Sequence, residues 1–260
     1  MPASTNRKGQ SRSNHDKKHI IVVETDMFGD VPVLVTSDLH AWCDKIFKLL
    51  DEYIALEHFI VITAGDMGGP PIFGYDGDPT EQYEFMLEKA KEFYFVQGNH
   101  DLPGICNKQK DLTNDCGSYC GLRDGKSIKT DIGSIGGVNG TMSNKAHPYK
   151  MPEKKYLKYI SDLLRKSRPR ILVTHDTPSL PLTYETSKDR FVGNEKLYKL
   201  ISQYKPLIHI YGHCHHPEFY YHIEGVHYFN VDARVVIFKP KSINIDNLIK
   251  KELIDLYYSE

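Results

Sequence analysis

Short apolar runs alternate with amphipathic stretches along most of the chain. The runs are four or five residues long and rich in β-branched side chains, a pattern typical of buried strands in an α/β protein. Apolar residues at helical spacing fill the intervals between several of these runs. The expected strands cover residues 33–36, 59–63, 93–97, 171–174 and 207–211, and the expected helices lie around residues 46–54, 83–90, 160–164 and 197–204.

The last part of the chain departs from this alternation. Residues 219–238 read as antiparallel strands, with Glu224 and Gly225 as a turn. A final helix is predicted with Ile249, Leu253 and Leu256 on one face. We therefore expect a mixed sheet within an α/β fold.

Composition limits the class of protein. Of the 260 residues, 40% are hydrophobic and 26% are charged, and no apolar run has the length of a membrane-spanning helix or the form of a signal peptide. The five cysteines are scattered and odd in number, which favours free thiols in a reducing compartment. The expectation is a cytoplasmic protein that does not enter a membrane.

The net charge of −1 conceals a basic N-terminus. Five basic residues and one acidic residue fall within residues 1–18, among Ser, Asn, Gly and Gln. Because this stretch has no apolar face, we expect a disordered basic tail, followed by one domain over residues 19–260. Outside the tail, 28 basic residues oppose 33 acidic ones, which disfavours a nucleic-acid partner.

Each of the five expected strands ends in a cluster of His, Asp or Asn. In open α/β sheets the carboxyl ends of the strands form the functional edge, so these clusters are expected to meet in space. Neighbouring glycines let the main chain turn sharply and approach a ligand. The clusters are Ser37-Asp38-Leu39-His40, Gly65-Asp66, Gly98-Asn99-His100-Asp101, Thr174-His175-Asp176 and Gly212-His213-Cys214-His215.

Side chains of these types suit divalent metals such as Mn, Fe, Zn, Co or Ni, and manganese is our first expectation. Seven candidate ligands are too many for one four-coordinate ion, so two ions fit better. Two ions about 3.5–4 Å apart can deprotonate a bridging water to hydroxide and neutralise the charge of a phosphoryl group. The pattern therefore predicts phosphate-ester hydrolysis. The candidate ligands are Asp38, His40, Asp66, Asn99, His175, His213 and His215.

The ordered series of motifs resembles the calcineurin-like metallophosphoesterase superfamily over residues 38–215. The resemblance implies a four-layer α/β/β/α sandwich, with two mixed β-sheets flanked by helices. It also implies that Asp66 bridges two metal ions and that His100 is a catalytic histidine that binds neither ion. By the same resemblance, Asp38, His40 and His215 hold one ion, and Asn99, His175 and His213 hold the other.

The sequence departs from the Ser/Thr protein phosphatases of this superfamily directly after Asp66. Those enzymes carry an Asp-Arg-Gly motif whose Asp orients the catalytic histidine, and here the chain reads Met67-Gly68-Gly69-Pro70-Pro71 instead. We therefore expect Asp101, or another carboxylate, to orient His100. The missing motif disfavours a phosphoprotein substrate.

Several residues are candidates for contact with the substrate. Asn99 and His100 belong to the strand-end clusters, whereas Lys145, His147 and Arg234 lie elsewhere and carry side chains that can bind phosphate. An ordinary surface loop is the competing interpretation of Lys145 and His147. A structural role is the competing interpretation of Arg234.

Other polar residues favour structural roles. Cys106, Cys116 and Cys120 have no fourth ligand at the spacing of a metal site. His209 lies inside an apolar strand, where a structural histidine is expected.

Three functions of different classes follow from these observations. The leading hypothesis is hydrolysis of phosphate mono- or diesters in a small molecule or nucleotide. The second is a nuclease that acts on DNA or RNA, which the acidic balance disfavours. The third is an inactive scaffold, similar to the retromer subunit built on this fold, which the intact ligand set disfavours. The oligomeric state stays open.

Overall fold

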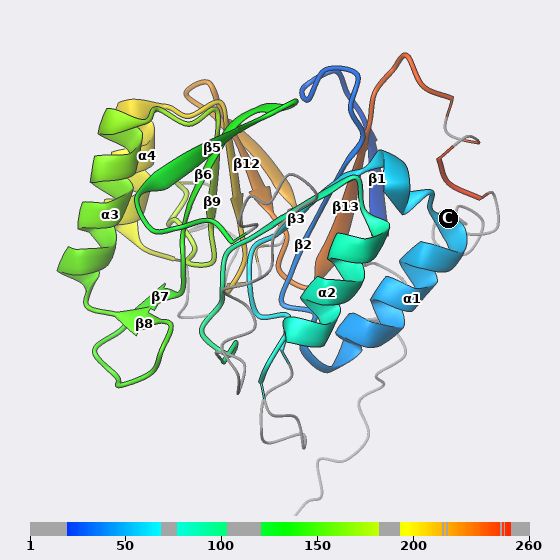
Figure 1. Ribbon diagram of the computed structural model, residues 1–260. Coiled ribbons are helices and arrows are strands. Elements are labelled where there is room, and N and C mark those ends of the chain that lie inside the picture. The colour runs from blue at the N-terminus through cyan, green and yellow to red at the C-terminus, as the bar shows by residue number, and fades with distance from the viewer. Residues whose placement is uncertain are drawn as a thin grey trace, which may run out of the picture.

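Two large β-sheets pack face to face between two layers of helices (Figure 1). The computed structural model describes residues 20–68, 77–102, 121–181, 193–214, 216, 218–244, 246 and 248–250. Both sheets are mixed, and the described residues include four α-helices. The predicted four-layer α/β/β/α sandwich is therefore confirmed.

The first sheet has five strands. They are β1 (Ile20–Glu24), β2 (Val33–Ser37), β3 (Ile60–Thr63), β4 (Glu92–Phe95) and β13 (Arg234–Lys239). Their order is β1-β13-β2-β3-β4, with β2, β3 and β4 parallel and β13 antiparallel to β2. Its outer face is covered by α1 (Cys43–Tyr53) and α2 (Thr80–Lys89), and two short 3₁₀ helices, η2 (His40–Trp42) and η3 (Leu56–His58), flank α1.

The second sheet has six strands. They are β5 (Lys126–Thr130), β6 (Gly133–Val138), β9 (Ile171–Thr174), β10 (Ile208–Tyr211), β11 (Tyr220–Ile223) and β12 (Val226–Asn230). Their order is β11-β12-β10-β9-β6-β5, with the four central strands parallel. Its outer face is covered by α3 (Glu153–Lys166) and α4 (Glu195–Tyr204), and a separate pair consists of β7 (Thr141–Met142) and β8 (Lys150–Met151).

Alternating residues of each central strand enter different apolar cores. Val33 and Val35 pack between the two sheets, whereas Leu34 packs beneath α1 and α2. In the second sheet, Val173 faces the first sheet and Leu172 faces α3 and α4. Because both faces of these strands are buried, the sequence shows continuous apolar runs instead of an apolar-polar alternation.

The structure confirms part of the prediction for the C-terminal region and corrects the rest. The antiparallel pair β11 and β12 turns at Glu224 and Gly225, with φ of 51° and 85°, as a tight hairpin turn of this kind requires. β13 does not continue this hairpin, because it crosses to the first sheet between β1 and β2. Ile249 forms an isolated antiparallel bridge with Ile54, so the predicted final helix does not include it. The basic tail, the three cysteines of the insert, and Leu253 and Leu256 lie outside the described residues.

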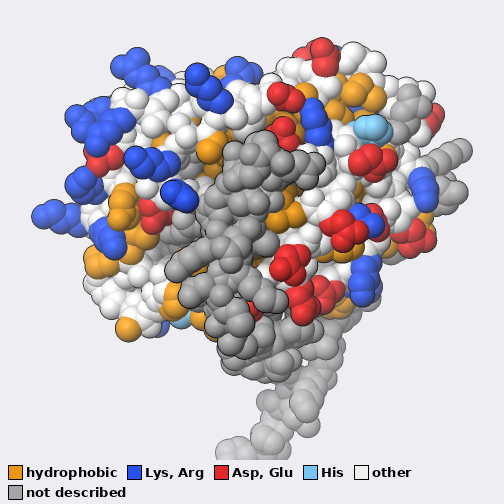
Figure 2. Space-filling view, viewed as in Figure 1, with side chains coloured by type: hydrophobic (Ala, Val, Ile, Leu, Met, Phe, Trp, Pro, Cys, Tyr) orange, Lys and Arg blue, Asp and Glu red, His pale blue; other side chains and the backbone are white. Residues whose placement is uncertain are grey.

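The surface carries its charges unevenly. Figure 2 shows Lys and Arg side chains gathered over the side of the molecule formed by α3 and α4. Among the helices described here, none is long and apolar enough to span a membrane.

Candidate metal centre

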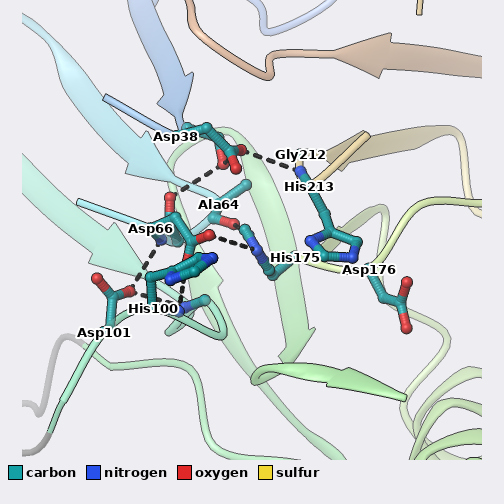
Figure 3. A network of polar contacts seen from close by, with 12 residues as sticks. Asp38, Ala64, Asp66, His100, Asp101, His175, Asp176, Gly212 and His213 are labelled. Carbon is teal, nitrogen blue, oxygen red and sulfur yellow. Dashed lines mark hydrogen bonds and ion pairs between the residues drawn. The ribbon is translucent and has the colours of Figure 1, made fainter. Parts of the chain in front are cut away.

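The polar clusters that follow β2, β3, β4, β9 and β10 meet at one edge of the two sheets (Figure 3). Main-chain hydrogen bonds join the loops: the N–H of Asp38 donates to the carbonyl of Gly65 at 2.9 Å, and the N–H of His40 donates to that of Asp66 at 3.1 Å. The N–H of His213 donates to the Asp38 carboxylate at 3.0 Å, which connects the first sheet to the second. The expected convergence of the strand ends is therefore present.

Four of the candidate ligands have left-handed backbone conformations. The φ angles are 57° for Asp38, 46° for His40, 54° for Asp66 and 69° for His213. Residues with a Cβ atom adopt this region at a cost of about 1–2 kcal/mol each. Such strain persists where the surrounding structure requires it, and it concentrates at functional sites.

The side chains form two ligand groups that share Asp66. Asp66, His175 and His213 make one group, and Asp38, His40 and Asp66 make the other, with ligand atoms within 4.8 Å of one another in each. The Asp66 Oδ2 atom lies 3.2 Å from His175 Nε2 and 3.9 Å from His40 Nε2. The two groups contain the described Asp and His residues that the resemblance assigns to each ion, Asn99 belongs to neither group, and His215 lies outside the described residues.

Two buried atoms in the centre have the properties of metal ligands. Asn99 Oδ1 and His175 Nε2 are both buried without a hydrogen-bond partner among the described residues. The Nδ1 atom of His175 lies 2.8 Å from the carbonyl of Ala64, so Nδ1 carries a proton and Nε2, 3.2 Å from Asp66 Oδ2, is the ring atom that can bind a metal once it is deprotonated. The Asn99 oxygen and the His175 nitrogen are therefore suited to bind a divalent ion.

The electrostatics of the centre favour cations. Burial raises the pKa of Asp38, whereas His175 and His40 overcome the effect of burial on Asp66 and hold its pKa well below the usual range. For His175 burial acts in the opposite direction, yet the carboxylates of Asp66 and Asp38 raise its pKa to about 10. A proton is thus held among these carboxylates, where a divalent ion can replace it. Burial lowers the pKa of His213 to about 4, which keeps this imidazole neutral and able to bind metal.

His100 lies beside the ligands without joining either group. Its main-chain N–H donates to Asp66 Oδ1 at 2.6 Å, and its ring meets that of His40 edge to face, with centroids 5.4 Å apart. Burial is the main reason that its pKa lies below the ordinary value, and the charges of His40 and Lys150 act in the same direction. The position agrees with a histidine that contacts the substrate and leaves the ions to other residues.

Asp101 has a different role from the predicted one. Its carboxylate is fully buried and accepts the main-chain N–H groups of Asp66 at 2.9 Å, Gly68 at 2.8 Å and Gly98 at 2.7 Å. Within the part of the chain that the structure describes, no hydrogen bond joins it to the His100 ring. Asp101 therefore braces the loops after β3 and β4, and no described contact supports the expected role of orienting His100.

Arg234 is also placed differently from the substrate contact that we expected. The side chain is only 7% exposed, and its guanidinium donates to the side chain and carbonyl of Asn230 and to the carbonyl of His216. These bonds tie the start of β13 to the segment around β11 and β12. Arg234 therefore supports the fold.

The loop between β7 and β8 contains Lys145 and His147. Lys145 is exposed, and its N–H donates to Ser143 Oγ at 3.2 Å. Burial and the charge of Lys150 lower the pKa of His147, while the charge of Asp66 acts on it in the opposite direction. His147 therefore lies within electrostatic reach of the metal centre, and no described contact places Lys145 there.

Sequence reasoning assigned no role to three residues that aim the ligands or add charge near them. Ser37 Oγ donates to Asp38 Oδ2 at 2.5 Å, and Asp176 Oδ2 accepts the N–H of Met142 at 2.7 Å, which fastens β7 beside His175. Lys150, on β8, lowers the pKa of both His100 and His147 by its positive charge. Ser37 and Asp176 stand next to ligands in the sequence, so adjacency was an available signal, whereas Lys150 had none.

The fold and the centre together define a metal-dependent phosphoesterase. The family model for calcineurin-like phosphoesterases matches residues 31–217, and the chain belongs to that family. A search of curated proteins finds no match to this sequence.

Solved structures agree with the fold. The crystal structure of TT1561 from Thermus thermophilus is 13% identical in sequence, with a TM-score of 0.54 over 78% of this chain and 90% of that one. A second crystal structure is 14% identical, with a TM-score of 0.57 over 77% of this chain and 90% of the other. The purple acid phosphatase PPD1 of yellow lupin is more distant, with 17% identity and a TM-score of 0.39 over 78% of this chain and 44% of its own.

Proposed function

We propose that this phosphoesterase hydrolyses phosphate mono- or diesters of small molecules, nucleotides included, with two divalent metal ions that Asp66 bridges. The observation that carries the proposal is the membership of Asp66 in both ligand groups. A single ion would leave one of these groups without a function. The family is metal-dependent, which supports metal binding at this centre.

The ligands divide into two sets around the shared carboxylate. Asp38 and His40, joined by His215, would hold one ion, and Asn99, His175 and His213 would hold the other. When bound, the ions would activate a water and neutralise charge on the phosphoryl group. We propose manganese first, because carboxylate, amide and imidazole ligands suit it, and we propose the cytoplasm as the location.

The side chains around the ligands would act on the substrate directly. His100 lies beside both groups with an exposed side chain, where its imidazole can donate a proton to the departing ester oxygen. Asn99 and His147 would contact the phosphoryl group, and the positive charge of Lys150 would attract a further anionic part of the substrate. This arrangement supports a small phosphorylated substrate.

The bridging role of Asp66 is tested by Asp66→Asn. Neutralising a carboxylate shared by two ions weakens both sites, so this variant should lose more bound metal and more activity than Asp38→Asn or His213→Asn, which each affect one site. We expect a loss of turnover of about 100-fold or more, since changes beside a metal alone cost about 10–100-fold. Elemental analysis of the purified proteins and turnover on a panel of phosphomonoesters, phosphodiesters and nucleotides would measure both effects.

Asp131→Asn is the matched control, because Asp131 is exposed and pairs only with Lys91 among the contacts described. It should keep full metal content and activity. Unchanged metal content in Asp66→Asn would refute the bridged pair of ions.

A further inference from the structure

Trp42 is the most exposed large apolar side chain in the described part of the protein. It is the sole tryptophan of the chain, and 51% of its surface is exposed. Tryptophan has a large apolar area and is highly buried on average, and an exposed indole offers a flat ring to a ligand. Tyr220, 37% exposed, is the other example, but its ring stacks on His227 and Phe229.

Trp42 has no capping function in the local structure, and only about half of its surface is covered. Trp42 precedes the first residue of α1, and its side chain makes no capping hydrogen bond. Among the described residues, its one aromatic or charged contact is the Lys45 ammonium, 5.1 Å from the ring centroid. With this contact, about half of the surface of Trp42 is still exposed.

Trp42 stands directly beside the metal centre. It ends η2, the single 3₁₀ turn that begins at His40, and residues of such a turn rise by only about 2 Å each. His40 belongs to the ligand group with Asp38 and Asp66, and its ring contacts that of His100. The main chain of Trp42 therefore lies only about 4 Å along the turn from that of a candidate ligand.

The chemistry of this position selects one class of substrate. A flat, exposed indole stacks on planar aromatic rings, and stacking of a nucleobase on an aromatic side chain is worth about 1–3 kcal/mol. The Lys45 ammonium beside the ring adds a positive charge that suits a phosphorylated molecule. Non-aromatic phosphoesters would gain nothing from stacking on the indole.

We propose that Trp42 is a stacking platform for the base of a nucleotide whose phosphate is held at the metal centre. The proposal rests on the proposed phosphoesterase function and narrows its substrate class to nucleotides. In this proposal Trp42 determines which substrates bind and has no structural role.

Because Trp42 is the only tryptophan, its fluorescence reports on this position alone. The full-length protein, as purified and after treatment with EDTA, would be titrated with AMP and with ribose 5-phosphate, which has the same phosphate and sugar but no base. We expect a saturable change in tryptophan emission with AMP and none with ribose 5-phosphate. The absence of any change with AMP in both preparations would overturn the proposal, whether or not the protein proves to hydrolyse phosphoesters.

Kinetics provide the second readout. Trp42→Ala should raise KM for AMP by about 10-fold, in line with the cost of lost base stacking, and leave KM for ribose 5-phosphate unchanged. Trp42→Phe should restore most of the affinity, and the matched control Tyr220→Ala should alter neither KM. Equal changes for both substrates in Trp42→Ala would show a structural role and overturn the proposal. Failure to hydrolyse either substrate would contradict the proposed function, and the fluorescence titration would still decide the role of Trp42.

Discussion

At the scale of single residues, three candidate ligands of the metal centre are each held by at least one further contact. His175 is oriented by the carbonyl of Ala64, and Asp66 is fixed by the N–H of His100. Asp38 accepts from both Ser37 Oγ and the N–H of His213. Such contacts hold ligand atoms in position before any ion arrives, which lowers the cost of binding it.

His100 offers a test of proton donation. If it is a general acid, His100→Asn should keep its metal and lose turnover on alkyl phosphate esters by about 10²–10⁴-fold, because an alkoxide is a poor leaving group. Nitrophenyl esters leave readily as anions and should lose much less. Turnover of the parent on alkyl esters should also fall as the pH rises through the lowered pKa of His100, since only the protonated ring can donate.

His213→Asn is the comparison, since loss of a ligand should reduce metal content and turnover on both ester types. If His100→Asn also loses its metal, then His100 is a ligand. If it keeps the metal and slows both ester types equally, then it stabilises charge and does not donate a proton.

His209 gives the fold a pH-sensitive residue away from the metal ligands. Its side chain is fully buried on β10, with Nε2 2.9 Å from Thr174 Oγ1 and with no hydrogen-bond partner for Nδ1 among the described residues. Burial lowers its pKa from 6.5 to about 3. Below about pH 6.5 His209 is protonated in the unfolded chain, whereas in the folded protein it stays neutral until about pH 3. Acid therefore lowers the free energy of unfolding over this pH range.

Removing this histidine should flatten the acid side of the stability curve. Between pH 7 and 5.5, the parent should lose about 1 kcal/mol of unfolding free energy that His209→Gln does not lose. Asp101 and Asp176, whose pKa values burial raises to about 6, act in the opposite direction, but they are common to both proteins. Urea unfolding at several pH values, with EDTA present, would measure the difference, and parallel curves would contradict the assignment.

The sequence indicated which side chains meet at the strand ends better than it indicated the contacts of the residues around them. A motif such as Gly98-Asn99-His100-Asp101 places its ligands by local chain geometry at a strand end, so adjacency carries the information. The roles of Asp101 and Arg234 depend instead on which donors and acceptors from distant loops are brought to them. The tertiary structure decides which of these donors and acceptors meet, and the local sequence carries no pattern that shows it.

At the scale of elements, the loops after β3 and β4 lie against each other through glycines. A Cβ atom on Gly65 would overlap the main chain of Gly98, and one on Gly98 would overlap the carboxylate and N–H of Asp66. No larger residue fits either position. The close approach lets the Asp101 carboxylate reach the N–H groups of both loops.

Gly98→Ala should therefore damage the metal centre through its effect on Asp66. Since the added methyl group forces Asp66 or its loop to move, we expect metal affinity to fall by about 10-fold or more and stability to fall by about 1–3 kcal/mol. Calorimetric titration with Mn²⁺ and thermal unfolding would measure the two effects. Gly29→Ala is the control: its φ is 70° and no atom lies within 4 Å of its added Cβ, so it should lose some stability but no metal affinity. Equal metal affinity in both variants would contradict this account.

The pattern of apolar residues predicted where strands lie but gave the wrong partners for a strand that pairs with segments distant in sequence. All five predicted strands and four predicted helices are present, because burial on one or two faces leaves a periodic signal. β13 carries the same apolar signal as β12, yet it pairs with β1 and β2 in the other sheet. Strand pairing is selected by packing between layers, and single-strand periodicity does not record it.

At the scale of the whole molecule, the net charge of −1 hides a strong separation of charge. Residues 20–102 hold 16 acidic and 4 basic residues, whereas residues 121–250 hold 12 acidic and 21 basic ones. The basic excess is dense over residues 153–170, where seven basic residues oppose two acidic ones, and Figure 2 shows it over α3 and α4. The net charge of the whole chain disfavours binding to polyanions. The electrostatic potential near a given surface, however, depends on which charges lie there.

The separation predicts retention on a polyanionic resin such as heparin at low salt. Replacing Lys154, Lys158 and Arg165, which are all exposed on α3, by Glu should lower the salt concentration of elution markedly. The matched control replaces Lys48, Lys89 and Lys91, on the side of α1 and α2, by Glu, which changes the net charge by the same amount. If position governs binding, the control should elute close to the parent, because its lysines lie among acidic groups such as Asp51 and Asp131. Equal shifts for the two triple variants would show that net charge governs retention and that α3 forms no polyanion-binding face.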